Sequence, residues 1–395
     1  MKYGNFFGGA LGVLVVLLVA GCDKMVEGKE NVPAGHISLE EVAAVLSGIP
    51  LGPEQMAEVR EATGTSAGNG YDEEYRMKDL FAAPGCGVGE DAATKAGSYS
   101  RPLRDLLREA VLAGQTKAAA MDPEAWLDSL AASDVQIYWP FSASWDGETL
   151  PVITYDPGDN AEENEGFLLK ADGSIEKVLV DEETARERPV WVVNRNSDAD
   201  YKSLELQRRE DPSWGSGGGE IIVHPQTTKA TDDARTLILR SFKVKRQFDS
   251  WLSGGSEFWI RCAGVDDYTV STEAEMRIYE PRITDFMIVV RRNQVGEELD
   301  VNTVLVSDWV EEMESGALMI VEDDGGTRTS WKASAVVKYN SKAYGVEVEF
   351  PINTRDDIVW RGALSYSFIE KALRKEKAAD RWIGLGEAEI LLDFI

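Results

Sequence analysis

Apolar residues recur at helical spacing in the part of the chain that begins near residue 36. After the capping-box pair Ser38 and Glu41, four apolar residues follow at intervals typical of a helix: Val42, Val45, Leu46 and Ile49. This spacing places them on one face, and the capping box marks where the helix begins. Three further apolar runs each begin just after a proline, namely Pro53, Pro102 and Pro123. Proline is favoured in the first turn of a helix. The pattern predicts a helical domain over residues 36–134.

From residue 135 the pattern changes to short runs of β-branched and aromatic residues, and these runs are separated by residues typical of turns. Examples are VQIYWPF, LPVITY and RPVWVVN, and Asp172-Gly173 is a typical hairpin turn. These runs predict a β-rich domain over residues 135–210. The glycine-rich stretch that follows predicts a linker over residues 211–235.

Alternation with a period of two is clearest near the end of the chain. In YGVEVEF, residues 344–350, the tyrosine, valines and phenylalanine face one way, whereas Glu347 and Glu349 face the other. Strands repeated at this spacing predict an antiparallel β-sandwich over residues 236–395, with a C-terminal helix that begins at Tyr366. One stripe of that helix is apolar: Phe368, Ile369, Ala372 and Leu373. The fold class expected for the whole chain is therefore α+β, with several domains.

Residues 68–91 interrupt the helical pattern. This segment begins GNGYDEEYRMKDLF and is rich in glycine and acidic residues. Because aspartate and glutamate are seldom fully buried, we expect the segment to be a long loop outside the core.

The first residues follow a pattern of their own. Lys2 precedes an apolar run over residues 10–20. The run is shorter than the roughly 20 residues of a helix that spans a bilayer, and its length is typical of a signal peptide. It ends in four residues that resemble the lipobox of bacterial lipoproteins: Val19, Ala20, Gly21 and Cys22.

This resemblance implies that residues 1–21 are a lipoprotein signal peptide and that the Cys22 thiol carries a lipid with acyl chains such as palmitate. Each buried methylene contributes about 0.8 kcal/mol, so two or three chains hold a protein firmly at a membrane. Residues 22–35 are polar and are expected to be a tether. We therefore expect a lipid-anchored protein of the bacterial cell envelope, and the sequence does not indicate which membrane.

Charge and cysteine content narrow the range of partners. The chain has 69 acidic and 41 basic residues and a formal net charge of −28, so its surface attracts cations and repels the phosphates of nucleic acids. Nucleic acid is therefore excluded as a partner, and a glycan or an envelope protein remains. Only two histidines and no C-x-x-C pair are present, which excludes a zinc cluster of those residues. A disulfide between Cys86 and Cys262 is left open.

Two acidic loops lie in the predicted sandwich, over residues 247–259 and 319–326. If they meet at one end of the sandwich, five carboxylates could surround calcium, a hard cation that prefers oxygen ligands: Asp249, Glu257, Glu322, Asp323 and Asp324. The strands and these loops resemble C2-type β-sandwiches, which implies a C2-like fold with calcium held by the loops. Calcium is the one cofactor candidate, and the alternative is that these acids lie in solvated turns.

Two tryptophans beside polar turns form a second candidate site. Trp145 and Trp251 could stack on the apolar face of a sugar ring if they are exposed. The alternative is that they pack in a core, as most aromatic residues do.

No catalytic motif stands in the context that its chemistry requires. Residues 64–68 match G-x-S-x-G, but they follow a helical pattern, whereas a nucleophile elbow follows a strand. Ser174 and Lys177 match S-x-x-K, but they follow a hairpin turn instead of lying on one helical turn. We therefore expect a non-catalytic binding or scaffolding role and assign no catalytic residue. The alternatives are a calcium-stabilised C2-like structural module and a glycan-acting hydrolase.

Overall fold

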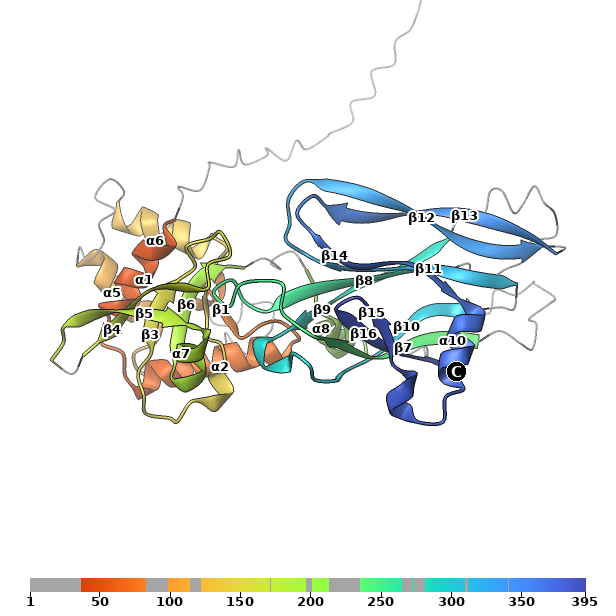
Figure 1. Ribbon diagram of the computed structural model, residues 1–395. Coiled ribbons are helices and arrows are strands. Elements are labelled where there is room, and N and C mark those ends of the chain that lie inside the picture. Colours follow the sequence, from red (N-terminus) through yellow and green to blue (C-terminus); the bar gives the residue numbers. More distant parts are fainter. Residues whose placement is uncertain are drawn as a thin grey trace, which may run out of the picture. The chain divides into compact units, whose positions relative to one another are not determined.

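Helices near the start of the described chain cover a mixed sheet (Figure 1). The computed structural model describes residues 37–82, 99–113, 122–170, 172–196, 201–212, 235–264, 272, 281–309, 312–339 and 341–395. The predicted signal peptide, lipobox and tether, Cys86 and most of the 211–235 linker lie outside these residues.

The predicted helix starts are confirmed. The Ser38 hydroxyl accepts a hydrogen bond from the Glu41 N–H, and the Asp122 carboxylate accepts one from the Ala125 N–H. Such side chains satisfy backbone donors that the first turn leaves unpaired. The helices are α1 (Leu39–Ser47), α2 (Pro53–Gly68), α3 (Met77–Leu80), α5 (Leu103–Leu112) and α6 (Pro123–Ala131).

The first sheet has the strand order β1-β2-β6-β3-β4-β5. Its strands are β1 (Glu74–Arg76), β2 (Val135–Tyr138), β3 (Val152–Tyr155), β4 (Glu163–Leu169), β5 (Ile175–Asp181) and β6 (Val190–Arg195). Neighbours pair antiparallel except β3 and β6, which are parallel. The helix α7 (Glu182–Glu187) links β5 to β6, and α8 (Leu204–Glu210) follows.

One core joins the helices to this sheet. It combines residues of α1, α2, α5 and α6 with strand residues such as Ile137 and Trp191. The sequence analysis treated 36–134 and 135–210 as separate domains, whereas their apolar side chains share this core. We refer to residues 37–212 as the helix–sheet region.

The expectation of a long loop over residues 68–91 is wrong in part. Within it, β1 pairs with β2, and α3 follows directly. Three consecutive acids there, Asp72, Glu73 and Glu74, are each at most 5% exposed. Composition alone therefore gave too polar a picture of this segment, because these acids accept hydrogen bonds inside the protein.

Residues 235–395, called the two-sheet region, contain two sheets that pack face to face. One has the order β10-β7-β16-β15, and the other has the order β13-β12-β11-β8-β9, with β14 also paired to β11. Apolar residues of both sheets form a shared core, to which Phe242 and Ile320 belong. The strands are β7 (Arg235–Val244), β8 (Ser256–Gly264), β9 (Arg282–Val290), β10 (Leu299–Trp309), β11 (Met313–Glu322), β12 (Arg328–Tyr339), β13 (Lys342–Asn353), β14 (Asp357–Ser365), β15 (Ile383–Leu385) and β16 (Ala388–Phe394).

The alternation predicted for YGVEVEF is confirmed in β13. Val346, Val348 and Phe350 are buried, and Glu347 and Glu349 are exposed. The coarse assignment to the α+β class is likewise confirmed, because helices and antiparallel sheets are both present.

The predicted C-terminal helix does not end the chain. The helix α10 (Tyr366–Leu373) forms, and then β15 and β16 follow, with β16 paired to β7 on one side and β15 on the other. Within α10, Phe368 remains 48% exposed, although Ile369 is fully buried. The sequence analysis extended the helix from this apolar stripe to the end of the chain and missed the strand pattern of the last residues. In that strand, Ile390 and Leu392 occupy alternate positions and both face the core.

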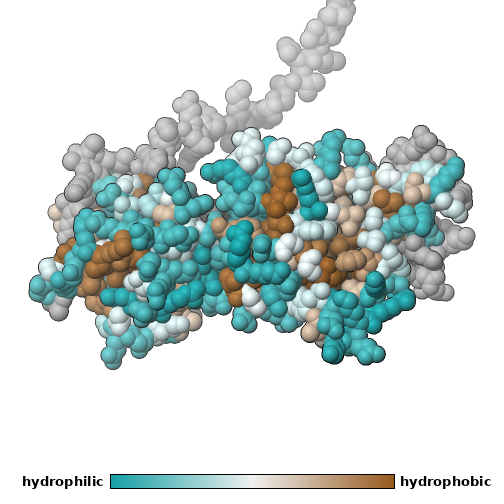
Figure 2. Space-filling model, in the orientation of Figure 1, coloured by the Kyte–Doolittle hydropathy of each residue, from teal (hydrophilic) through white to brown (hydrophobic). Residues whose placement is uncertain are grey.

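Ile37–Ile395 form one compact unit. Polar residues cover most of the face drawn in Figure 2, in keeping with the charged composition. A smaller apolar area lies over β4 and β5, where Ile175 and Leu179 are exposed. In the part of the chain that the structure describes, no helix has both the length and the apolar character needed to cross a membrane.

Candidate metal centre

Glu322 is the last residue of β11 and the most deeply buried acid of the candidate site. Along β11, Leu318 and Ile320 face the core between the two sheets, and the period of two places Glu322 on that same face. Its neighbours in the sheet are Phe258 of β8 and Asp357 of β14. With a strand on each side and a sheet opposite, Glu322 is 0% exposed.

Asp249 comes from the connection between β7 and β8. We call residues 247–255 the Trp251 loop. The buried guanidinium of Arg292 donates a hydrogen bond to the Asp249 carbonyl at 2.6 Å and another to the Gly254 carbonyl at 2.9 Å. The Ser256 hydroxyl accepts from the Asp249 N–H at 3.3 Å. The loop backbone is therefore held in place, and this orients the Asp249 carboxylate.

Asp324 lies in the turn that follows β11. The next two residues, Gly325 and Gly326, have φ angles of +68° and +105°, which L side chains rarely adopt. A Cβ on Gly326 would also come within 2.7 Å of the Thr354 hydroxyl. Glycine is therefore required for the turn that brings Asp324 back towards Glu322.

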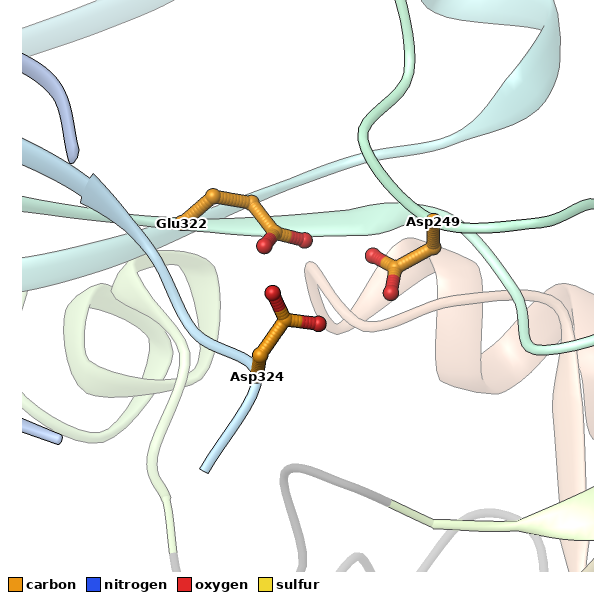
Figure 3. A group of neighbouring side chains, drawn as sticks. All are labelled: Asp249, Glu322 and Asp324. Atoms are coloured by element: carbon orange, nitrogen blue, oxygen red, sulfur yellow. The ribbon is translucent and has the colours of Figure 1, made fainter. Parts of the chain in front are cut away.

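These three carboxylates point towards a common space (Figure 3). One oxygen of each lies within 4.8 Å of the others. Among the described residues, both Glu322 oxygens and one Asp249 oxygen are buried without a hydrogen-bond partner. Within those same residues no basic side chain forms an ion pair with any of the three. The three carboxyl groups thus lie close together with no ion pair to a basic side chain among the described residues.

Burial and mutual repulsion raise the pKa values at this centre. Burial raises the pKa of Glu322 far above its ordinary range; the Asp249 carboxyl, with which Glu322 can share a proton, adds most to the shift after burial, followed by Asp324 and Glu257. Partial desolvation, followed by the charge of Asp249, raises the pKa of Asp324 to about 6, although this residue is exposed. Both shifts mean that the carboxylates hold protons more tightly than free acids do, as expected of anions placed together without a cation.

A cavity of about 390 Å³ adjoins the centre. The two-sheet region lines it with Asp249, Ser253, Gly255, Glu257, Asp323 and Asp324. The helix–sheet region contributes Leu39, Asp156, Pro157, Gly158, Asn160 and Arg195. The Arg195 guanidinium already contacts Asp134 and the Ile37 carbonyl. Among the described residues, the other charged side chains that line the cavity are acidic.

The structure brings together three of the five acids predicted from the two loops. Glu257 lines the same cavity and is 7% exposed, but its carboxylate is not among the oxygens that converge. Asp323 is committed elsewhere: its carboxylate accepts hydrogen bonds from the Trp259 indole, the Gly325 N–H and the Asn353 amide. Asp323 thus shapes the turn and does not face the cation space.

The connection between β3 and β4 also reaches this cavity. Asp156 lines it and accepts a hydrogen bond from the Ser253 hydroxyl at 3.1 Å. The sequence gave no indication that Asp156 and Asp249 would line one cavity, because nearly a hundred positions separate them.

Neither candidate for sugar stacking is a free surface tryptophan. Trp251 is 0% exposed and packs with Tyr138, Val152 and Val192 of the first sheet. Trp145 is half-buried against the core of the helix–sheet region, and its indole donates to the Thr149 carbonyl. The prediction of an exposed stacking residue is therefore wrong for Trp251, because the loop turns its side chain into the neighbouring region.

The chemistry of the ligands favours a hard cation such as calcium for this centre. The converging ligands are carboxylate oxygens alone, which suits hard cations and not zinc. The converging oxygens lie within 4.8 Å of one another, so a single ion placed between them can be reached by all three carboxylates.

Two other motifs have structural roles. Residues 64–68 form the end of α2, and the Ser66 hydroxyl donates to Glu74, so the G-x-S-x-G match is no nucleophile elbow. Ser174 lies in the hairpin between β4 and β5, where its hydroxyl bonds Asp172.

Comparisons with protein-family models, with curated proteins and with solved structures found no match.

Proposed function

We propose that this protein is a non-catalytic binding protein of the bacterial cell envelope, anchored by lipid at Cys22, whose two-sheet region binds calcium through Asp249, Glu322 and Asp324. One observation carries the calcium site: Glu322 is fully buried, and neither of its oxygens has a hydrogen-bond partner among the described residues. Burial of an unpaired carboxylate costs several kcal/mol. A bound cation removes that cost and the repulsion from the other two acids.

The C2-like assignment for the two-sheet region belongs to this proposal. It is supported by the two loops on which the resemblance was based, because acids from both converge at one end of the two sheets. A calcium ion there would join the β7–β8 connection to the end of β11. This would make the ion a structural element of the region, as expected of a calcium-stabilised module.

The alternative of a glycan-acting hydrolase has less support. A general acid must come within hydrogen-bond reach of the glycosidic oxygen that it protonates. Glu322 has the raised pKa that such a role requires, but it is 0% exposed. A binding role remains the better explanation, with a glycan or another envelope protein as the partner class and no role for nucleic acid.

Isothermal titration calorimetry tests the calcium site. The full chain, purified in detergent and stripped with chelator, is titrated with calcium and separately with magnesium. We expect saturable calcium binding that is tighter than magnesium binding, and we expect Glu322→Gln to lose it, because the amide keeps the shape but carries no charge. Glu347→Gln is the matched control, since Glu347 is exposed on β13 and pairs with Lys332. Wild-type protein that binds no calcium would refute the proposal.

A further inference from the structure

The Trp251 loop connects the metal centre to the helix–sheet region. Asp249 provides a carboxylate of the centre, and two positions later the Trp251 indole is buried against Tyr138, Val152 and Val192. The indole N–H donates to the Glu162 carbonyl at 2.8 Å. One short loop therefore carries both a cation-facing acid and the aromatic residue that docks in the other region.

Contacts from the helix–sheet region hold the second half of the loop. The Asn194 amide in β6 donates to the Leu252 carbonyl at 3.1 Å and to the Ser253 carbonyl at 2.7 Å. The buried Asp72 carboxylate accepts from the Gly255 N–H at 2.6 Å. None of these groups belongs to the converging carboxylates, so they report on docking without taking part in ion binding.

The first half of the loop is exposed to the charge of the metal centre. The Asp249 carboxylate lies beside Glu322, which is fully buried and has no hydrogen-bond partner among the described residues. Without a cation, repulsion between these groups is relieved either by protons or by movement of Asp249. Movement of Asp249 displaces the loop that carries Trp251. A bound cation turns the repulsion into attraction and holds Asp249 in place.

We propose that calcium bound by Asp249, Glu322 and Asp324 regulates the docking of the Trp251 loop into the helix–sheet region. The bound ion holds the loop docked, and release of the ion loosens it. This inference rests on the proposed function, because it requires that the centre bind calcium. It adds that the ion controls one of the contacts between the two regions, the apolar cluster that Trp251 and Leu252 form with strands of the first sheet.

Linkage provides a test that leaves the ion's ligands untouched. If calcium favours the docked loop, then a docked loop must favour calcium by the same factor. Weakening the docking alone should therefore weaken calcium binding. Coupling between sites typically amounts to a factor of about 5–150.

The experiment measures calcium affinity by calorimetry for the full chain and three variants. Trp251→Ala removes the docked indole, and Asn194→Ala removes the amide that holds the Leu252 and Ser253 carbonyls. Trp331→Ala is the matched control, because this tryptophan stacks on Phe350 in the β12–β13 hairpin. We expect the first two variants to bind calcium at least about fivefold more weakly and the control to bind as the wild type does.

Each outcome decides the question. If Trp251→Ala fails to fold by circular dichroism, Asn194→Ala alone decides. Wild-type affinity in the folded docking variants would overturn the regulation and leave the calcium site intact. An equal loss in Trp331→Ala would also overturn it, because the effect would then be a general loss of stability. A wild-type chain that binds no calcium would refute the proposed function itself.

Discussion

Glu322 occupies a position in β11 that apolar residues fill earlier in the same strand. Leu318 and Ile320 face the core between the sheets, and Glu322 follows in the same phase. An acid in that phase is a recognisable signal, because a carboxylate there must be neutralised by a proton, a base or a metal ion. Since Glu322 forms no ion pair with a basic side chain among the described residues, a proton and a cation compete for the centre.

Calcium affinity should depend on pH around the pKa of Asp324. That pKa is raised to about 6, first by partial desolvation and then by Asp249, so a proton must leave before calcium binds. We expect affinity to rise with pH from about pH 5 upwards, because Asp324 and then Glu322 must release protons when calcium binds. Calorimetry in two buffers of different ionisation heat, at two pH values, measures the affinity and the protons released.

In the protein without a bound cation, stability changes with pH in the direction opposite to that of calcium affinity. The pKa of Asp324 in the folded chain is higher than its ordinary value of 3.8, so the folded state binds a proton that the unfolded state has released. In chelator, the contribution of Asp324 to stability is complete below about pH 3.8 and is lost as the pH rises through about 6. A calcium affinity that falls with rising pH would contradict this account.

Residue-level reasoning from the sequence identified the right loops but not the role of each acid. Asp323 and Asp324 are adjacent and identical in type, yet one accepts three hydrogen bonds and the other faces the cation space. Asp72 and Glu73 show the same limit. They accept backbone hydrogen bonds from Gly255 and Ser142, which lie far away in the sequence. Such roles depend on tertiary neighbours, which a single sequence does not reveal.

At the scale of elements, local signals predicted most of the helices and strands. The cap at Ser38 and the proline at position 123 marked two helix starts, and alternation marked β13, because each signal acts within a few residues. The last part of the chain was predicted less well. There, the stripe around Ile369 indicated a helix, and the strand β16 just beyond it was missed. Its place between β7 and β15 is set by long-range pairing.

This difference predicts how two apolar residues contribute to stability. Ile390→Ala in β16 should reduce the free energy of unfolding by about 2–5 kcal/mol, because Ile390 is 1% exposed in the core between the sheets. Phe368→Ala in α10 should cost less than about 1 kcal/mol, because that ring is 48% exposed. Urea unfolding of both variants in chelator measures the two values. A larger loss of unfolding free energy for Phe368→Ala than for Ile390→Ala would show that α10 contributes more than β16 to the stability of the two-sheet region.

At the scale of the whole molecule, the metal centre depends on contacts that join distant parts of the chain. Asp249 and Asp324 come from separate loops, and the adjoining cavity also takes residues from the β3–β4 connection. The sequence indicated that both acidic loops could meet at one end of the two sheets, but it gave no sign of the helix–sheet region beside them. It also left open whether Trp251 is exposed or packed in a core, because nothing local distinguishes a docked tryptophan from an exposed one.

The proposed anchor is a separate property of the whole chain and has its own test. Mass spectrometry of the mature protein from a bacterial host should find an acylated Cys22 at the N-terminus. Cys22→Ala should leave residues 1–21 uncleaved, because lipid attachment to the thiol precedes cleavage. Cys262→Ala is the control, since Cys262 is buried in β8, and this variant should still be processed. A mature protein with an unmodified Cys22 would disprove the anchor.

The central claim is that Asp249, Glu322 and Asp324 bind one calcium ion. Its most direct test is X-ray diffraction from crystals grown with calcium, with anomalous data collected at long wavelength. We expect one anomalous peak among the three carboxylates, with oxygens of all three residues at about 2.3–2.6 Å, and no such peak in Glu322→Gln crystals. Ordered water in that space, with Glu322 protonated and no anomalous signal at saturating calcium, would contradict that claim.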